Sequence, residues 1–197
     1  MTRLIANVLD LETTGKNEPE HRIIEYSNRL YDWVTGDFLK EITWRINPLR
    51  RIDPGAFKVH GISAEMVKDC MTFDVVAPAI VSLIRASAIV IAHNGGGPKY
   101  PGDKGFDYPF LKRELERVGE KMPDVPWFDT MAEGRFATHN GKIPTLGELC
   151  RTFDVEYDPA KAHSGSYDTT KTAESYFEGL RIGAWPDHGA PLLAQAA

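Results

Sequence analysis

The sequence lacks the features that mark several protein classes. It has only two cysteines, Cys70 and Cys150, too few for a disulfide framework and without the spacing of a metal-binding motif. Its best apolar run, residues 88–92, is far shorter than the roughly 18 residues that a membrane-spanning helix needs. The apolar stretch near the N-terminus ends at Asp10, too early for a signal peptide. We therefore predict a soluble protein of the cytoplasm.

An excess of basic residues is also missing. Lysine and arginine total 23 against 28 aspartates and glutamates, which gives a formal net charge of −5. Domains that bind nucleic acid are usually basic, so the charge alone ranks nucleic acid low among the partners. The length of 197 residues predicts one domain. We expect this domain to span residues 1–183 and residues 184–197 to form a flexible tail.

The spacing of apolar residues predicts an α/β fold. Alternating or continuous apolar residues indicate strands, and apolar residues three and four apart indicate helices. Gly36 and Asp37 separate the second and third strands, so these two are expected to form a hairpin. Three strands come first, and helices and strands then alternate, which favours a mixed sheet. The predicted strands are 4–9, 23–31, 42–46, 88–92 and 127–128, and the predicted helices surround 76–84, 111–118, 146–153 and 173–180.

Two carboxylates stand at the end of the first predicted strand. Asp10 and Glu12 are two residues apart, so in a strand they face the same side. Like charges at that separation repel one another unless a cation lies between them. Carboxylate oxygens suit Mg²⁺ or Mn²⁺, so the pair is a candidate metal site. The alternative is a solvated strand edge.

Two further polar clusters follow strands or begin helices. Asn94 comes directly after the fourth strand, where α/β proteins often bind ligands, and Asp107 begins the next helix. His163 lies in a serine- and glycine-containing loop five residues before Asp168, which is near the start of the last helix. Each residue has a simpler interpretation: the aspartates as helix caps and His163 as a surface histidine.

Six segments in this order resemble the DEDDh group of DnaQ-like 3′–5′ exonucleases, to which the proofreading epsilon subunit of bacterial DNA polymerase III and ribonuclease T belong. The resemblance runs from about Leu4 to Leu180. It rests on residues 10–15 (DLETTG), 59–62 (VHGI), 92–94 (AHN) with 106–107 (FD), 129–130 (DT), 145–154, and 163–168 with its histidine and aspartate.

The resemblance implies a ribonuclease-H-like fold, with a five-stranded mixed sheet and helices on both faces. It implies hydrolysis of phosphodiester bonds at a 3′ end with two divalent ions, Mg²⁺ or Mn²⁺. Asp10 would bridge the two ions, Glu12 and Asp168 would complete one site, and Asp107 would hold the second ion. His163 would be the general base that deprotonates the attacking water.

The same resemblance suggests which residues contact the substrate. Two threonines would bond the terminal sugar, an asparagine the backbone, and three other side chains would stack on or wedge between the last bases; these are Thr13, Thr14, Asn94, His60, Ile62 and Phe106. For Phe106 and Ile62, core packing is an equal alternative. Lys58, Lys112, Arg113 and Lys142 are candidates for phosphate contacts, with a solvated surface role as the alternative.

Single-stranded DNA is the favoured substrate, with release of nucleoside 5′-monophosphates. The alternatives are a 3′–5′ exoribonuclease, since the sequence does not settle whether a 2′-hydroxyl is read, and an inactive nucleic-acid-binding module. The segment beyond Leu180 shows no glutamine-rich clamp-binding pattern. We therefore expect a free-standing enzyme without a polymerase tether.

One segment departs from the family pattern. Residues 95–105 separate the two parts of the second motif and contain five of the 17 glycines, which predicts a mobile loop. The family usually has only a short connection there. Such an insertion is compatible with Asp107 keeping its place if the loop bulges outward. A gate over the substrate and an inert insertion are equally compatible with the sequence.

Overall fold

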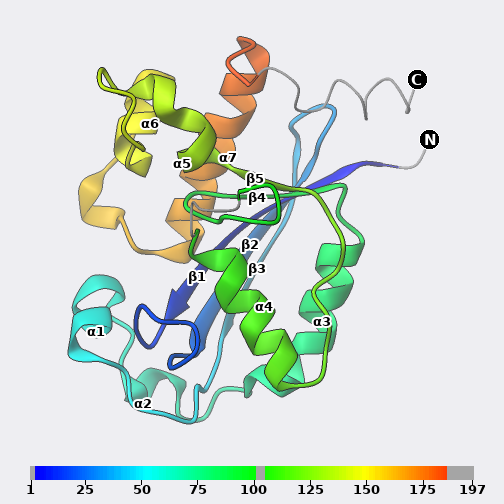
Figure 1. Cartoon of the computed structure of the whole chain (residues 1–197), viewed down its shortest axis with the longest axis vertical. Helices are drawn as coiled ribbons and strands as arrows, with labels where there is room; N and C mark the ends of the chain where they lie inside the picture. Colours follow the sequence, from blue (N-terminus) through cyan, green and yellow to red (C-terminus); the bar gives the residue numbers. More distant parts are fainter. Residues whose placement is uncertain (1–2, 101–104, 186–197) are drawn as a thin grey trace.

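The computed structural model describes residues 3–100 and 105–185, and it is built on one five-stranded sheet (Figure 1). The strand order is β3-β2-β1-β4-β5. The first three strands pair antiparallel, whereas β4 runs parallel to β1, and β5 runs parallel to β4. The predicted mixed sheet is therefore confirmed. The strands are β1 (Ile5–Thr13), β2 (Ile23–Asp32), β3 (Phe38–Arg45), β4 (Ile89–Ala92) and β5 (Trp127–Asp129).

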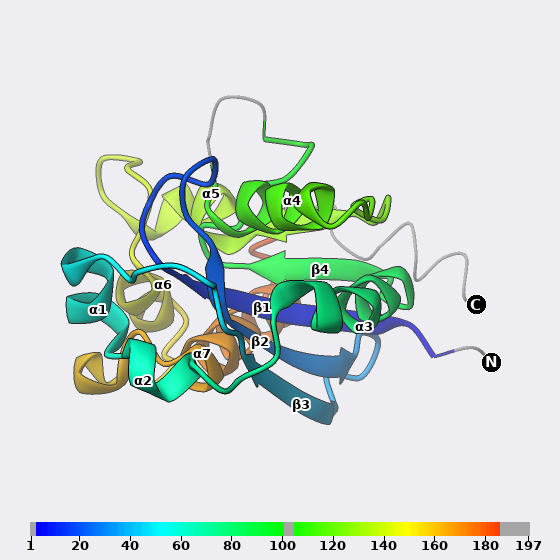
Figure 2. The ribbon, with the colours of Figure 1, turned by 90° about the horizontal axis from the view of Figure 1, so that it is seen from below.

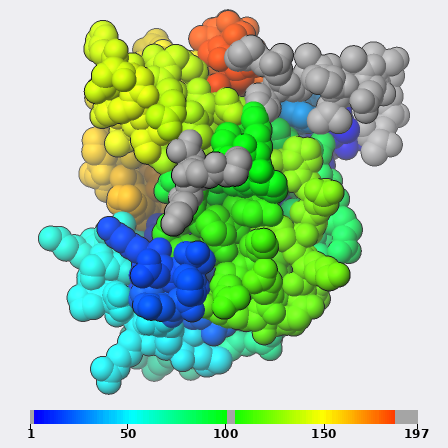
Figure 3. Space-filling view, viewed as in Figure 1, coloured from blue at the N-terminus to red at the C-terminus, as the bar shows by residue number. Residues whose placement is uncertain are grey.

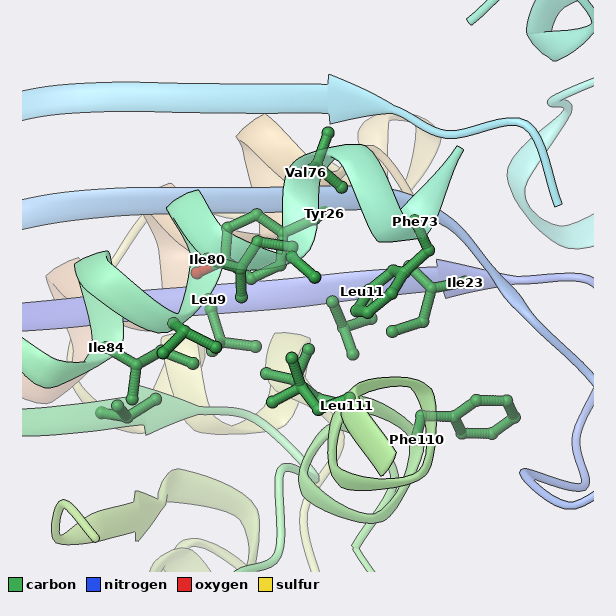
Figure 4. Close-up of a cluster of buried hydrophobic side chains, with 14 of the residues drawn as sticks. Leu9, Leu11, Ile23, Tyr26, Phe73, Val76, Ile80, Ile84, Phe110 and Leu111 are labelled. Atoms are coloured by element: carbon green, nitrogen blue, oxygen red, sulfur yellow. The ribbon is translucent and has the colours of Figure 1, made fainter. Parts of the chain in front are cut away.

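Helices cover both faces of this sheet (Figures 1 and 2). Alternation along β1 points Leu9 and Leu11 toward one cluster with the helices α3 and α4, and Ala6 and Val8 toward a second cluster with α6 and α7. Figure 4 shows the first of these clusters. The helices are α1 (Pro54–His60), α2 (Ala64–Val67), α3 (Phe73–Arg85), α4 (Asp107–Arg117), α5 (Thr130–Glu133), α6 (Leu146–Thr152) and α7 (Gly165–Arg181), with 3₁₀ turns η1 (Gly134–Ala137) and η2 (Pro159–Lys161).

Local sequence signals account for several element ends. Gly36 adopts a φ of 77° in the connection from β2 to β3, which favours glycine. Thr145 and Glu148 form the capping box at the start of α6, since each side chain bonds the other residue's backbone N–H. The short helices α1 and α2 were not predicted from the sequence, because neither has a long apolar stripe. Figure 1 shows both of them near the carboxyl end of β1.

The packed domain extends two residues beyond the predicted boundary at residue 183. Trp185 is 4% exposed, and its indole N–H donates to the Tyr176 carbonyl at 2.9 Å. Its ring contacts the rings of Phe128 and Phe153 edge-on. Gly179 leaves room for this ring, because a Cβ there would overlap the indole. The rest of the predicted tail, residues 186–197, lies outside the described residues.

The two ends of the glycine-rich insertion are held together. The Phe106 N–H donates to the Asn94 carbonyl at 2.5 Å, and the Tyr108 N–H donates to the Gly95 carbonyl at 2.9 Å. These bonds return the chain to the start of α4 beside the end of β4. The insertion therefore leaves the end of β4 and the start of α4 adjacent. No helix in the described part of the chain is long and apolar enough to cross a membrane.

Candidate active site

The carboxylates of β1 face the helix α7. Asp10 and Glu12 continue the alternation of Ala6 and Val8, whose side chains pack on the cluster that contains α7. Glu12 is 9% exposed, and Asp10 is half-buried. The two aligned acids therefore lie on the same face at the carboxyl end of the central strand, as the sequence predicted.

The start of α7 brings Asp168 to this face. Asp168 lies in the first turn of α7, and its Oδ2 accepts a hydrogen bond of 2.8 Å from the backbone N–H of His163. His163 has a φ of 62°, which turns the chain back toward the helix, and its side chain is exposed. Gly165 allows this approach, because a Cβ there would overlap the Ser27 side chain on β2. Asp168 is not the N-cap of its helix, because Ser164 holds that position.

Asp107 reaches the same carboxylates from α4. It is the first residue of the helix, it is 2% exposed, and the backbone N–H of Leu11 donates to it. Phe106 holds the N-cap position, so Asp107 is not a capping residue. The helix macrodipole favours a negative charge at this end. The four acids therefore come from three elements that are far apart in sequence.

These acids repel one another. Burial raises the pKa of Asp10 well above its usual range, and the neighbouring carboxylates of Asp168 and Glu25 add to the effect. Burial and the charge of Asp10 raise the pKa of Glu12 to about 9. Burial and Asp10 also raise the pKa of Asp107, and burial raises that of Asp168. A positive charge placed beside these carboxylates would stabilise their ionised forms.

A fifth acid, Glu25, belongs to the same surface and escaped the sequence analysis. It pairs with Glu12 across β1 and β2, and with Arg45 across β2 and β3, so the three residues form a row across the sheet. Glu25 is 5% exposed and forms an ion pair with Arg45. Arg45 also lowers the pKa of Glu12. Only the strand register, which the sequence did not specify, could have revealed this row.

The donor set fits divalent cations. Oδ1 of Asp168 is buried and has no hydrogen-bond partner, and the surrounding carboxylates raise one another's pKa values. Hard oxygen donors of this kind are the ligands that Mg²⁺ and Mn²⁺ prefer. Among the described residues, no three acidic, histidine or cysteine side chains are grouped so that they could hold an ion. Ion binding would therefore draw together carboxylates that now repel one another.

A pocket of about 600 Å³ opens beside these acids. Its lining includes Glu12, Thr13, His60 and Phe106. The His60 Nδ1 accepts from the Ile62 N–H at 2.9 Å, so its Nε2 carries the proton and donates to the Thr13 carbonyl at 3.2 Å. Burial lowers the pKa of His60, which favours this neutral form. Three of the predicted substrate-contact residues therefore line one cavity next to the acids.

The other three predicted contact residues lie elsewhere. Thr14 is fully buried, and its hydroxyl accepts from the Arg22 N–H at 3.1 Å. Ile62 is 2% exposed and packs with Ile24 in a small apolar cluster, which is the core-packing alternative. Asn94 has a φ of 69°, and its backbone N–H donates to Asp129. These positions give the three residues structural contacts and leave them out of the pocket lining.

The sequence matches the RNase_T family, described as exonuclease, over residues 8–176. The chain belongs to this exonuclease family. The resemblance to the DnaQ-like exonucleases is therefore confirmed. The chain is also 30% identical over 185 residues to the DNA polymerase III subunit epsilon of Rickettsia conorii. This match covers 90% of the present chain and 74% of the Rickettsia protein.

Solved exonuclease structures share the fold. E. coli exonuclease I in complex with a dT13 oligonucleotide superposes with a TM-score of 0.71 at 15% identity, and covers 98% of this chain. The match spans only 43% of that exonuclease I chain. Exonuclease X in complex with 5′ overhanging duplex DNA gives a TM-score of 0.64 at 22% identity, and covers 91% of this chain and 93% of that chain. The predicted ribonuclease-H-like fold is confirmed by these neighbours.

Proposed function

We propose that this exonuclease removes nucleotides from the 3′ end of single-stranded DNA and releases nucleoside 5′-monophosphates. The observation that carries the proposal is a group of four mutually repelling carboxylates beside a pocket that His60 lines. These carboxylates belong to Asp10, Glu12, Asp107 and Asp168. Similar structures with a dT13 oligonucleotide and with overhanging duplex DNA support DNA as the substrate.

The four carboxylates would hold two divalent ions, Mg²⁺ or Mn²⁺. We assign Asp10 to both ions, Glu12 and Asp168 to one, and Asp107 to the other. Bound there, the ions would supply electrostatic stabilisation of the attacking and leaving oxygen atoms. The raised pKa values of the acids support this assignment, because a nearby positive charge favours their ionised forms.

His163 would accept the proton of the attacking water. Its side chain is exposed, and its backbone N–H donates to Asp168. The positive charge of its imidazole would lower the pKa of Asp168, so the ring is near this acid. His163 acts on the water itself and is therefore proposed as a catalytic residue.

Thr13, His60 and Phe106 would hold the terminal nucleotide in the adjacent pocket. The Phe106 ring is half-buried and rests 4.6 Å from the ring of Phe110, measured between centroids, so it is held in place for stacking on a base. His60 is fixed by hydrogen bonds at both ring nitrogens. The similarity to a bacterial DNA polymerase III subunit supports the cytoplasm as the compartment.

The test is a 5′-labelled single-stranded DNA incubated with Mg²⁺ or Mn²⁺, alone and in competition with RNA of the same sequence. A ladder that shortens from the 3′ end supports the proposal, and Asp168→Asn should abolish it. Faster shortening of the RNA would indicate an exoribonuclease. Binding of either strand without cleavage by either metal would indicate an inactive binding module.

A further inference from the structure

A second pocket of about 640 Å³ adjoins the first. It is lined by the loop of residues 16–20, by Phe106, Tyr108 and Lys112 at the start of α4, and by Gly97 and Tyr100 of the insertion. Lys16, Asn17, Glu20 and Phe106 line both pockets, so the two lie side by side. In Figure 3 the loop after β1, in blue, stands beside the surface of α4, in green.

The lining of this second pocket offers stacking surface and positive charge. The half-buried ring of Tyr108 is braced edge-on against Trp127, with 5.1 Å between ring centroids. Lys112 is exposed and has no carboxylate partner among the residues that the structure describes. Glu18 and Glu20 offset the lysine charges, so the pocket does not attract anions by a net positive charge. Stacking on an aromatic face, with one phosphate near Lys112, suits this combination.

The loop wall of the pocket is preformed. The guanidinium of Arg117, at the end of α4, donates to the carbonyls of Glu18 and Pro19 at 2.8 Å and of His21 at 2.9 Å. Arg117 is itself paired with the fully buried Glu114. The loop therefore keeps its shape without a ligand, which reduces the ordering cost of binding.

The insertion supplies the opposite wall. The Tyr100 hydroxyl donates to Glu133 at 2.9 Å and accepts from the Asp129 backbone N–H at 3.2 Å. The Gly96 N–H donates to the Asp129 carboxylate at 2.8 Å. These bonds fasten the described part of the insertion to the end of β5.

We propose that this second pocket binds another nucleotide of the substrate strand, on the 5′ side of the nucleotide in the first pocket. The base would stack on the ring of Tyr108, and Lys112 would contact its phosphate. The inference rests on the proposed function, because a strand cut at its 3′ end leaves its remaining nucleotides on the 5′ side.

The test measures binding separately from cleavage. Fluorescence anisotropy gives the Kd of 5′-labelled ligands of increasing length, from a single nucleotide upward, in the presence of a chelator. Kd of the wild type should fall once the strand is long enough to enter the second pocket. Lys112→Gln should raise Kd for those longer strands about threefold and reduce the slope of log Kd against log salt by about 0.7. It should leave the single nucleotide unchanged.

Arg113→Gln is the matched control. Arg113 is the next residue of α4 and carries the same charge. It pairs with Glu116 and does not line the pocket, which agrees with the solvated surface role that was the alternative to a phosphate contact. It should leave Kd and the salt slope unchanged. Tyr108→Leu should weaken the longer strands about tenfold, whereas Tyr108→Phe, which keeps the ring, should retain the wild-type Kd.

The proposal is overturned if Lys112→Gln and Arg113→Gln have the same effect, or if Tyr108→Leu weakens strands of every length equally. Both results are readable even if no strand is cut. Absence of cleavage would contradict the proposed function alone, because the length dependence of Kd does not require catalysis.

Discussion

Two aspartates at the same edge of the sheet differ in the groups that surround their carboxylates. Asp129, at the end of β5, is 1% exposed, and its carboxylate accepts four backbone hydrogen bonds of 2.8–3.2 Å, from residues 94, 96, 131 and 132. Asp10, near the end of β1, faces other carboxylates that raise its pKa. The charge of Asp129 is therefore satisfied by N–H groups of the chain itself, whereas the charge of Asp10 would be stabilised by a cation bound beside it.

The hydrogen bonds of Asp129 give this acid a structural role, whereas Asp10 has the proposed role of holding ions. The carboxylate of Asp129 joins the base of the insertion to the start of α5, so it fixes backbone. Burial and neighbouring carboxylates raise the pKa values of the acids around Asp10, and such raised values are typical of functional sites.

The largest expected effect is the loss of catalysis in Asp10→Asn. The amide keeps the size of the side chain and removes one charge from the proposed ion site. We expect kcat to fall by about a thousandfold, since metal-based charge stabilisation contributes several kcal/mol. The 5′-labelled DNA assay measures it. A fall of less than tenfold would show that Asp10 is not a ligand.

His163→Ala should reduce kcat about a hundredfold while Kd for the DNA changes little. The reason is that a general base contributes to the transition state and contacts only the attacking water. Unchanged kcat would remove His163 from the mechanism.

Asp129→Ala tests the other side of the comparison. It leaves four backbone N–H groups without their acceptor, so the free energy of unfolding should decrease by about 3 kcal/mol. Urea denaturation measures this, with Asp124→Ala as the control because Asp124 is exposed. Equal stability of the two variants would contradict a structural role for Asp129.

A smaller effect is expected from His93, near the same region, on how the unfolding free energy depends on pH. Burial lowers the pKa of His93 to about 4, and its Nδ1 lies 3.0 Å from the Thr130 hydroxyl. As the pH falls through about 6.5, the unfolded chain takes up a proton at His93 that the folded chain does not take up. This residue should therefore lower the unfolding free energy by about 1–2 kcal/mol between pH 7 and pH 5, against the opposite contribution of the carboxylates whose pKa values are raised. His93→Gln should lack this part of the decrease, and parallel curves for both proteins would contradict the assignment.

The sequence predicted the parts of the molecule that depend on local pattern. The five strands and the capping box at Thr145 follow from periodicity and local motifs. The approach of Asp10, Glu12, Asp107 and Asp168 was implied by the resemblance to the exonuclease family. The sequence did not predict which residues lie side by side on neighbouring strands.

Three findings depended on register or tertiary packing. The row of Glu12, Glu25 and Arg45 requires the strand register, and the burial of Trp185 requires the space above Gly179. The burial of Ile62 follows from its packing against β2. No local pattern distinguishes such residues from solvent-facing ones, because their surroundings come from elsewhere in the chain.

The carboxylates around Asp10 should oppose folding until a divalent ion binds them. Their raised pKa values mean that the metal-free fold keeps protons that the unfolded chain releases, so stability is lost as the pH rises from about 4 toward these raised values, and most of it is lost by pH 8. The most direct test is the unfolding temperature at pH 8 with and without Mn²⁺.

The wild type should gain about 2.7 kcal/mol, or roughly 5–10 °C, when Mn²⁺ is present at a hundred times its Kd. Asp10→Asn should unfold at a higher temperature than the wild type without the ion and gain much less from it. Equal gains in the two proteins, or a metal-free Asp10→Asn less stable than the wild type, would contradict the account.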